Sequence, residues 1–216
     1  MRLLFFSFVA IACASYAAWA RAADSDLSAN ARLLVAARNG DIEAEQRALH
    51  AGASPNARNR IGETALVIGL KRNDLVTVRA MLEAGTDVNI AAVNGVTALM
   101  AAAYSGQADI VEALLRRGAE AGAVDRLGKT AMVYAAGQGH AAVVRALLEH
   151  GVDANARYRN ELTALMWAAG YGRDEAVKVL LAAGASRDAR DNRGKSAADI
   201  ARDAGFETTV GLLSRP

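Results

Sequence analysis

Residues 95–103 read Gly-Val-Thr-Ala-Leu-Met-Ala-Ala-Ala, and a similar stretch returns every 33 residues along the chain. The hydroxyl residue of this stretch forms a regular series: Thr64, Thr97, Thr130, Thr163 and Ser196. Ala31 holds the same position one period earlier. Two glycine-rich series keep this interval, namely Gly52, Gly85, Gly118, Gly151 and Gly184, and Gly40, Asn73, Gly106, Gly139, Gly172 and Gly205. Three series with one period indicate an internal repeat, which is typical of a solenoid.

Each position of the repeat has a local structural explanation. The threonine or serine precedes an apolar stretch and can cap the start of a first helix. Glycine or asparagine of the third series suits a tight turn, because it tolerates a positive φ. Apolar residues then recur at helical spacing, as in Val111 with Leu114 and Leu115, and predict a second helix that ends at the glycine of the second series.

Two helices, a tight turn and a hairpin loop in 33 residues resemble the ankyrin repeat. The resemblance is carried by residues 95–103, by residues 139–148 (GHAAVVRALL) and by residues 151–155 (GVDAN). It implies an all-α solenoid of stacked helix-turn-helix units with hairpin loops. The units are expected near residues 26–58, 59–91, 92–124, 125–157, 158–190 and 191–216. The motif Thr-Ala-Leu-Met resembles the corresponding motif of bacterial members of the family.

The chain departs from the family pattern at two positions of each unit. The family commonly has proline after the threonine, where this chain has alanine, and histidine two residues further on, where it has Met100 and Met166 among others. We therefore expect the hydrogen bonds of that histidine to be missing and apolar contacts to replace them.

The N-terminus has the layout of a secretory signal peptide. Met1 and Arg2 give a positive start, an apolar run follows, and Ala20-Arg21-Ala22 matches a cleavage pattern. We predict a signal peptide over residues 1–22, a repeat domain over residues 23–216, and a periplasmic location. Cleavage after Ala20, an uncleaved membrane anchor, lipidation of Cys13 and secretion beyond the cell are the alternatives.

Charge and cysteine content limit the partners of the mature chain. Removing residues 1–22 takes Arg2 and Arg21 away, which leaves 23 basic residues against 23 acidic ones and no cysteine. A nearly neutral protein gives no general attraction to nucleic acid or to an anionic membrane. We expect a monomer that is stabilised by packing alone and binds neither of these.

No residue pattern indicates catalysis, a cofactor or a metal. His140 follows the glycine between two helices, while His50 and His150 lie at predicted helix ends, where they suit the helix dipole. Acidic residues such as Asp41, Glu43 and Glu45 fall at the start of a second helix and have no second group to perturb their pKa. An enzyme with an unrecognised groove site remains the alternative.

The resemblance implies protein binding in a concave groove made by the hairpin tips and the exposed face of the first helices. A secreted effector that binds a host protein is a second form of this hypothesis. Carried over position by position, the candidate partner-binding residues are Arg60, Val93, Asn94, Val96, Tyr104, Arg126, Lys129, Arg159, Tyr171 and Arg193.

Within this set, Val93, Val96 and Tyr104 are the predicted anchors for a partner with an acidic surface. The hairpins carry nine basic and four acidic residues, so their edge is positively charged. Basic residues around an apolar centre are typical of a protein interface. Trp167 occupies a position where packing between first helices is expected.

Overall fold

The computed structural model describes residues 27–214 and contains twelve α-helices and one 3-10 helix in that range. The predicted signal peptide, its predicted cleavage sites and Cys13 lie outside the described residues. The first helices of the six units are α2 (Ala29–Asn39), α4 (Ala65–Arg72), α6 (Ala98–Tyr104), α8 (Ala131–Gln138), α10 (Ala164–Gly170) and α12 (Ala197–Asp203). The second helices are α3 (Ile42–His50), α5 (Leu75–Glu83), α7 (Ala108–Arg116), α9 (Ala141–Glu149), α11 (Asp174–Ala182) and α13 (Glu207–Leu213).

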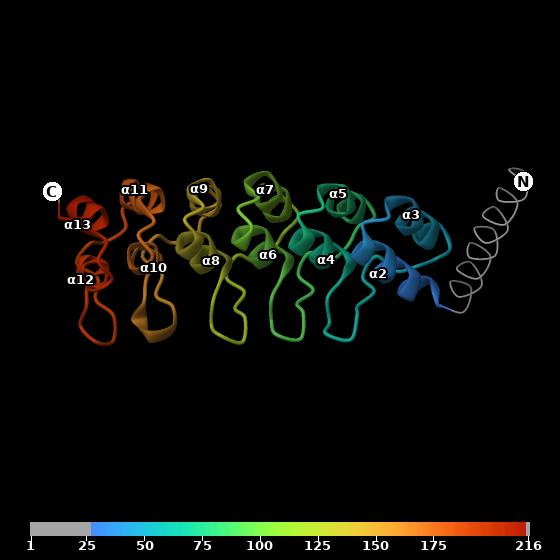
Figure 1. Cartoon of the computed structure of the whole chain (residues 1–216), viewed down its shortest axis with the longest axis horizontal. Helices are drawn as coiled ribbons and strands as arrows, with labels where there is room; N and C mark the ends of the chain where they lie inside the picture. Colours follow the sequence, from blue (N-terminus) through green and yellow to red (C-terminus); the bar gives the residue numbers. More distant parts are fainter. Residues whose placement is uncertain (1–26, 215–216) are drawn as a thin grey trace, which may run out of the picture.

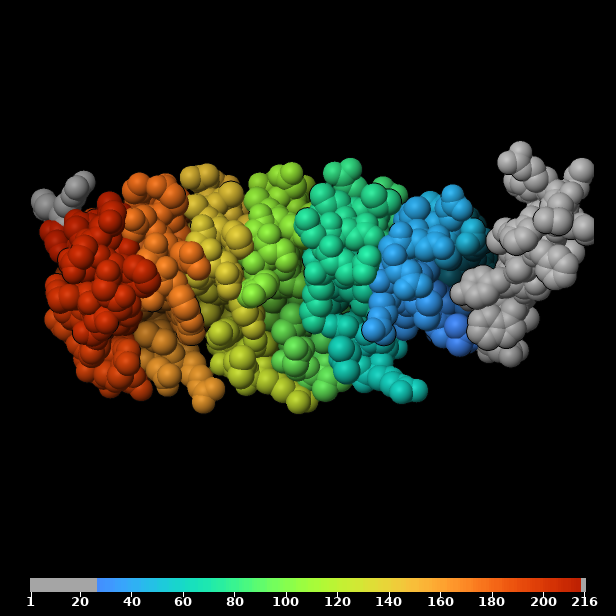
Figure 2. All heavy atoms as spheres, in the orientation of Figure 1, coloured from blue at the N-terminus to red at the C-terminus, as the bar shows by residue number. Residues whose placement is uncertain are grey.

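The six helix pairs stack in a single row, so the predicted all-α solenoid is confirmed. The second helices form one layer, the first helices lie beneath them, and the hairpins project from the side of the first helices (Figure 1). The space-filling view shows the hairpin tips as separate projections along one edge of the molecule (Figure 2). One apolar core runs through the row, and Met100 and Met166 are both buried in it, as expected.

The hydroxyl series caps the first helices, as predicted. The side chains of Thr64, Thr97, Thr130, Thr163 and Ser196 each accept a bond from the backbone N–H three residues later. Ala31 holds this position in the first unit but does not cap the helix. There the helix begins earlier, at Ala29, because Ser28 Oγ accepts the Ala31 N–H and alanine has no side-chain acceptor.

The turn between the two helices of a unit requires the glycine or asparagine that the sequence supplies. Gly106 has a φ of 74°, and a Cβ atom there would lie 2.6 Å from Nδ1 of His140. The next repeat therefore packs directly onto this turn. Asn73 takes the same position in the second unit with a φ of 57°, which asparagine tolerates better than most side chains.

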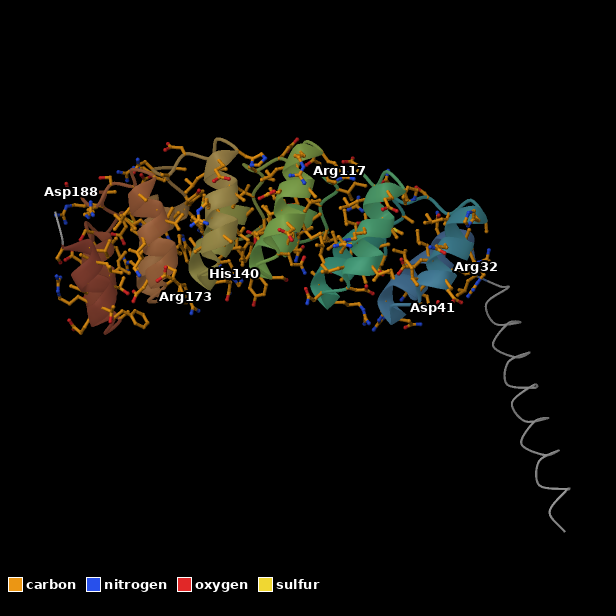
Figure 3. The ribbon with its side chains drawn as sticks, turned by 90° about the horizontal axis from the view of Figure 1, so that it is seen from above. Arg32, Asp41, Arg117, His140, Arg173 and Asp188 are labelled. Carbon is orange, nitrogen blue, oxygen red and sulfur yellow. The ribbon has the colours of Figure 1, made fainter. Side chains whose placement is uncertain are left out.

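Neighbouring repeats are joined by residues at the start of the second helix. The side chain of Gln107 donates to Asn73 Oδ1, and His140 Nε2 lies 2.9 Å from the Tyr104 carbonyl oxygen. Arg173 Nε donates to the Gly137 carbonyl oxygen at 3.0 Å. His140 and Arg173 lie along the same long edge of the row (Figure 3). These contacts come from the start of the second helix. The histidine that the family commonly has, and that this chain lacks, would lie in the first helix instead.

The fifth hairpin differs from its neighbours. Asn160 and Glu161 adopt positive φ values of 62° and 61° where other hairpins have a single glycine, and the 3-10 helix η1 (Arg159–Glu161) forms there. Adjacent hairpins are joined by backbone bonds such as Val93 N–H to the Ile61 carbonyl oxygen. Within residues 27–214 no such bond joins Arg159 to Leu127, so the fourth and fifth hairpins are held less tightly.

Replacing Thr97 with alanine is expected to lower the free energy of unfolding by about 1 kcal/mol, because the Met100 N–H loses its acceptor at a buried helix start. Chemical denaturation followed by circular dichroism measures the change. Thr208 is exposed on α13, so Thr208→Ala is the matched control and should change stability by less than about 0.5 kcal/mol. Equal losses in the two variants would show that the hydroxyl series is not a set of helix caps.

Candidate functional site

The hairpin face, defined here as the hairpins together with the exposed sides of α4, α6, α8 and α10, carries an aromatic cluster. Tyr104 and Tyr134 meet edge to face with ring centroids 5.8 Å apart. Trp167 and Tyr171 stack at 6.2 Å. The Lys129 ammonium lies over both pairs, 5.5 Å from the Tyr134 ring centroid and 5.0 Å from that of Trp167. Three successive first helices, α6, α8 and α10, contribute the rings.

The cluster lines a groove and leaves large apolar surface exposed. Tyr104 and Tyr171 are 54% and 52% exposed. A hollow of about 130 Å³ lies between them and also contacts Lys129, Gly137 and Trp167. A second hollow of about 220 Å³ continues along α10 toward Arg193. Single exposed apolar residues are ordinary, whereas a connected aromatic surface is typical of a binding site.

Tyr134 is fixed in this cluster through its hydroxyl group, which donates to Asp125 Oδ2 at 2.5 Å. Burial raises the pKa of Tyr134 well above its usual range, and the Asp125 carboxylate raises it further. The phenol therefore stays protonated near neutral pH. The other oxygen of Asp125 accepts the backbone N–H groups of Leu127 and Lys129, so this carboxylate organises the fourth hairpin.

The predicted anchors separate into two groups. Val93 is exposed at a hairpin tip, where it contacts the turn at Gly62, while Val96 is half-buried against the core. Asn94 has a structural role, because its side chain accepts the Val96 N–H and its carbonyl accepts the Arg126 N–H. Tyr104 instead joins the aromatic cluster together with Tyr171.

Sequence reasoning missed two members of the cluster. Trp167 does pack against the core, as expected, but the same half-buried ring also lines both hollows. Tyr134 was not selected at all. Both residues occupy the same position of successive repeats, and this coincidence of two aromatic residues on adjacent first helices was the available signal.

Most of the hairpin cations have partners within the chain. Arg58 donates to the carbonyl oxygens of Gly62 and Ala91, Arg157 pairs with Glu161, and Arg190 donates to the Gly194 carbonyl oxygen. Arg193 pairs with Asp191, and Lys195 with Asp203. The guanidinium groups of Arg60, Arg126 and Arg159 make no hydrogen bond or ion pair within residues 27–214, and Lys129 makes no ion pair there. Among the nine hairpin cations, the free positive charge is therefore concentrated in these four residues.

The histidines have structural contacts. Nδ1 of His50 lies 2.8 Å from the Gln46 carbonyl oxygen, and Nδ1 of His150 lies 2.9 Å from the Ala146 carbonyl oxygen, so each closes the end of a second helix. Among residues 27–214 no three His, Cys, Asp or Glu side chains are close enough together to bind a metal ion. In the same range, no helix has the length and apolar character needed to cross a membrane.

Glu45 lies in the first turn of α3, as predicted, but it is buried. Its side chain is 0% exposed and replaces the valine that Val78 and Val111 provide in later units. Burial raises its pKa, and the nearby carboxylates of Asp74 and Asp41 raise it further, although a hydrogen bond from Thr77 opposes them. The expectation that no second group perturbs the pKa of Glu45 is corrected on the same ground.

A larger hollow of about 420 Å³ lies at the N-terminal end of the row, between α2 and α3. Its lining includes Val35, Asn39, Asp41 and Arg47. In every later unit, the corresponding face packs on the repeat before it. This hollow is therefore the end face of a stack rather than part of the hairpin face.

Comparison with known families agrees with the geometry. A family model described as "Ankyrin repeats (3 copies)" matches residues 33–125 and again residues 117–191, which together make up more than half of the chain. A search of curated proteins found no match.

Proposed function

Because the chain belongs to the ankyrin-repeat family, whose repeats generally act as scaffolds for protein–protein interaction, we propose that it binds a partner protein on its hairpin face. The observation that carries this proposal is the exposed aromatic cluster of Tyr104, Tyr134, Trp167 and Tyr171. Aromatic side chains are enriched at the centres of protein interfaces, and a few of them supply most of the binding energy.

The charge around the cluster favours a partner with an acidic surface. Arg60, Arg126 and Arg159 project from three hairpins without a carboxylate partner among residues 27–214, and Lys129 lies between the rings. Exposed charges of this kind contribute mainly to the rate and specificity of association. A partner that brings carboxylates toward the hairpins complements this pattern.

The bound partner is not chemically altered in this proposal. Ankyrin repeats are typically non-catalytic interaction modules. In the aromatic cluster, the pKa of the Tyr134 phenol is strongly raised, which keeps this group protonated and bonded to Asp125. A group with so high a pKa is a poor general base near neutral pH.

The proposal also includes export to the periplasm, supported by the predicted signal peptide over residues 1–22. Cell fractionation followed by immunoblotting tests this part. Recovery of a shortened chain in the periplasmic fraction is expected. Recovery in the membrane fraction would favour the anchored or lipidated alternative, and recovery in the medium would favour a secreted effector.

Site-specific photo-cross-linking in living cells tests which face binds the partner. With p-benzoylphenylalanine at position 104, in place of an exposed tyrosine, illumination is expected to give a defined adduct with another protein. The matched control places the same amino acid at Arg145, which is exposed on α9 on the opposite layer of the row. No comparable adduct is expected there.

The distribution of adducts decides between the outcomes. An adduct from position 104 that mass spectrometry identifies as one protein supports binding on the hairpin face. Equal adducts from both positions, or adducts from position 145 alone, would contradict it. A chain that gives no adduct at either position in its native cells would count against stable protein binding altogether.

A further inference from the structure

Two of the repeats carry an ion pair across the hairpin face, between the residue before the helix cap and a residue eight positions later. In the second unit Glu63 pairs with Lys71. In the sixth unit Lys195 pairs with Asp203. Both pairs join the base of a hairpin to the end of the first helix of the same unit. In these two units, each charge at these positions therefore has an opposite charge in its own repeat.

The fourth unit has the cation of this pair but not the carboxylate. Lys129 occupies the position of Lys195, and Gly137 occupies that of Asp203. Because Gly137 has no side chain, a space opens above it, bounded by Tyr104, Tyr134, Trp167 and Tyr171. The ammonium of Lys129 lies over two aromatic rings instead of against a carboxylate.

Within residues 27–214, no internal group replaces the missing carboxylate. Asp125 is the nearest acidic residue in the hairpin, but its oxygens already accept bonds from Tyr134 and from the backbone of Leu127 and Lys129. The residues that line the hollow include a second cation, Arg173, and no aspartate or glutamate. Arg173 donates through Nε to the Gly137 carbonyl oxygen and makes no ion pair within residues 27–214. The groove is therefore positively charged and has aromatic walls.

We propose that the space above Gly137 receives an aspartate or glutamate side chain of the partner protein, which pairs with Lys129 and completes an ion pair that two other repeats make internally. An apolar side chain next to that residue packs against the exposed rings of Tyr104 and Tyr171. The ligand is thus a short acidic segment with an apolar neighbour. This inference rests on protein binding at the hairpin face and specifies which part of the partner is recognised.

It is energetically favourable for Lys129 to replace its contacts with the aromatic rings by an ion pair with the partner. An ammonium over aromatic rings is held by a modest attraction, and a hydrogen-bonded carboxylate is a stronger partner in a site that excludes water. The indole Nε1 of Trp167 is buried and has no hydrogen-bond partner within residues 27–214. An acceptor on the partner that reaches this N–H would remove the cost of leaving it unpaired.

A selection from random peptides displayed on phage tests the proposal, with the full chain as the target. Trp19→Phe in this chain leaves Trp167 as its only tryptophan, so its fluorescence reports binding in the groove. The selected peptides are expected to share an acidic residue beside an apolar one. Against Lys129→Glu, selection should instead favour lysine or arginine at the shared position.

A double-mutant cycle with one selected peptide measures the ion pair itself. Replacing the acidic residue of the peptide with its amide is expected to weaken binding to the wild-type chain by about tenfold. Against Lys129→Met, the two peptides should bind with nearly equal affinity. Lys195→Met is the matched control, since it removes a lysine from the same repeat position that already has an internal partner. It should preserve the full difference between the peptides.

Gly137→Asp provides a test that adds the missing group. A Cβ atom at position 137 would meet only ordinary contacts, the nearest being carbons of the Tyr171 ring at 3.8 Å. The new carboxylate is expected to pair with Lys129 and to weaken binding of the acidic peptide by about tenfold, with unchanged helix content.

The outcomes separate this inference from the broader proposal. Peptides that share no acidic residue, or that lose equal affinity on Lys129→Met and Lys195→Met, would overturn the carboxylate site. If such peptides still shifted the emission of Trp167, binding on the hairpin face would stand. Failure to select any peptide that perturbs Trp167 would overturn the carboxylate site, and the cross-linking experiment would then decide the broader proposal independently.

Discussion

Replacing Leu114 with alanine is expected to lower the free energy of unfolding by about 2–5 kcal/mol. Leu114 is 0% exposed in α7, and this helix packs against both α6 of its own unit and α9 of the next. The buried residues of α6 are mostly alanines, including Ala102 and Ala103, whose short side chains cannot extend into the cavity that the variant leaves. The loss therefore falls near the upper part of the usual range.

Denaturant unfolding followed by circular dichroism measures this loss, and Leu115→Ala is its matched control. Leu115 is the next residue of the same helix and is only partly buried. Truncating it should cost clearly less, since a smaller part of the side chain leaves the core. If both variants lost the same stability, the buried stripe would not run through Leu114. Because each repeat contacts only its neighbours, the variant should also uncouple the two ends of the row into separate transitions.

The parts of the fold that could be predicted from the sequence are those governed by local rules. The cap at Thr97 depends on one side-chain oxygen, and the turn at Gly106 depends on one backbone conformation. Leu114 was placed in the core by its spacing from Val111. Because the repeat recurs every 33 residues, each local rule applies again in the other units. Since the stacking of identical units follows from the period, the overall architecture could be predicted as well.

The candidate site was predicted less well because it depends on differences between repeats. The repeat pattern shows only what the units have in common. Tyr134 and Trp167 belong to the candidate site because they differ from Ala101, the small residue at the same position of the third unit. Which rings stack, and which hairpin cations already have internal partners, depends on side-chain geometry across the row. That Lys129 lacks an internal carboxylate partner became clear only from the structure, where Gly137 holds the position that carries Asp203 in the sixth unit.

Glu45 is the clearest conflict between the repeat pattern and the physics of burial. Thr77 Oγ1 lies 2.6 Å from Glu45 Oε1 and 3.1 Å from Asp74 Oδ2. A hydroxyl group has one proton and can donate to only one of these carboxyl groups. A protonated Glu45 resolves the conflict, because its own O–H can donate to Thr77 while Thr77 donates to Asp74. The raised pKa of Glu45 agrees with this arrangement.

Replacing Glu45 with valine is expected to raise the free energy of unfolding at neutral pH by about 1–3 kcal/mol. The change removes a buried carboxyl group whose Oε2 has no hydrogen-bond partner within residues 27–214. It also restores the residue found at this position in the following units, for example Val78 and Val111. Thr77 keeps Asp74 as its acceptor, so the variant leaves no new buried polar group unpaired. Denaturant unfolding at neutral pH measures the gain.

The variant Glu45→Gln isolates the contribution of ionisation. Because the pKa of Glu45 is raised in the folded chain above its ordinary value of 4.5, protonation stabilises the fold below pH 4.5. This stability is lost as the pH rises through the raised pKa. The wild-type chain should therefore become less stable relative to Glu45→Gln from pH 4.5 upward, until Glu45 is fully ionised. Glu43 is exposed on the same helix, so Glu43→Gln is the control and should follow the wild-type curve closely. Parallel curves for the wild type and Glu45→Gln would show that Glu45 titrates normally in the fold.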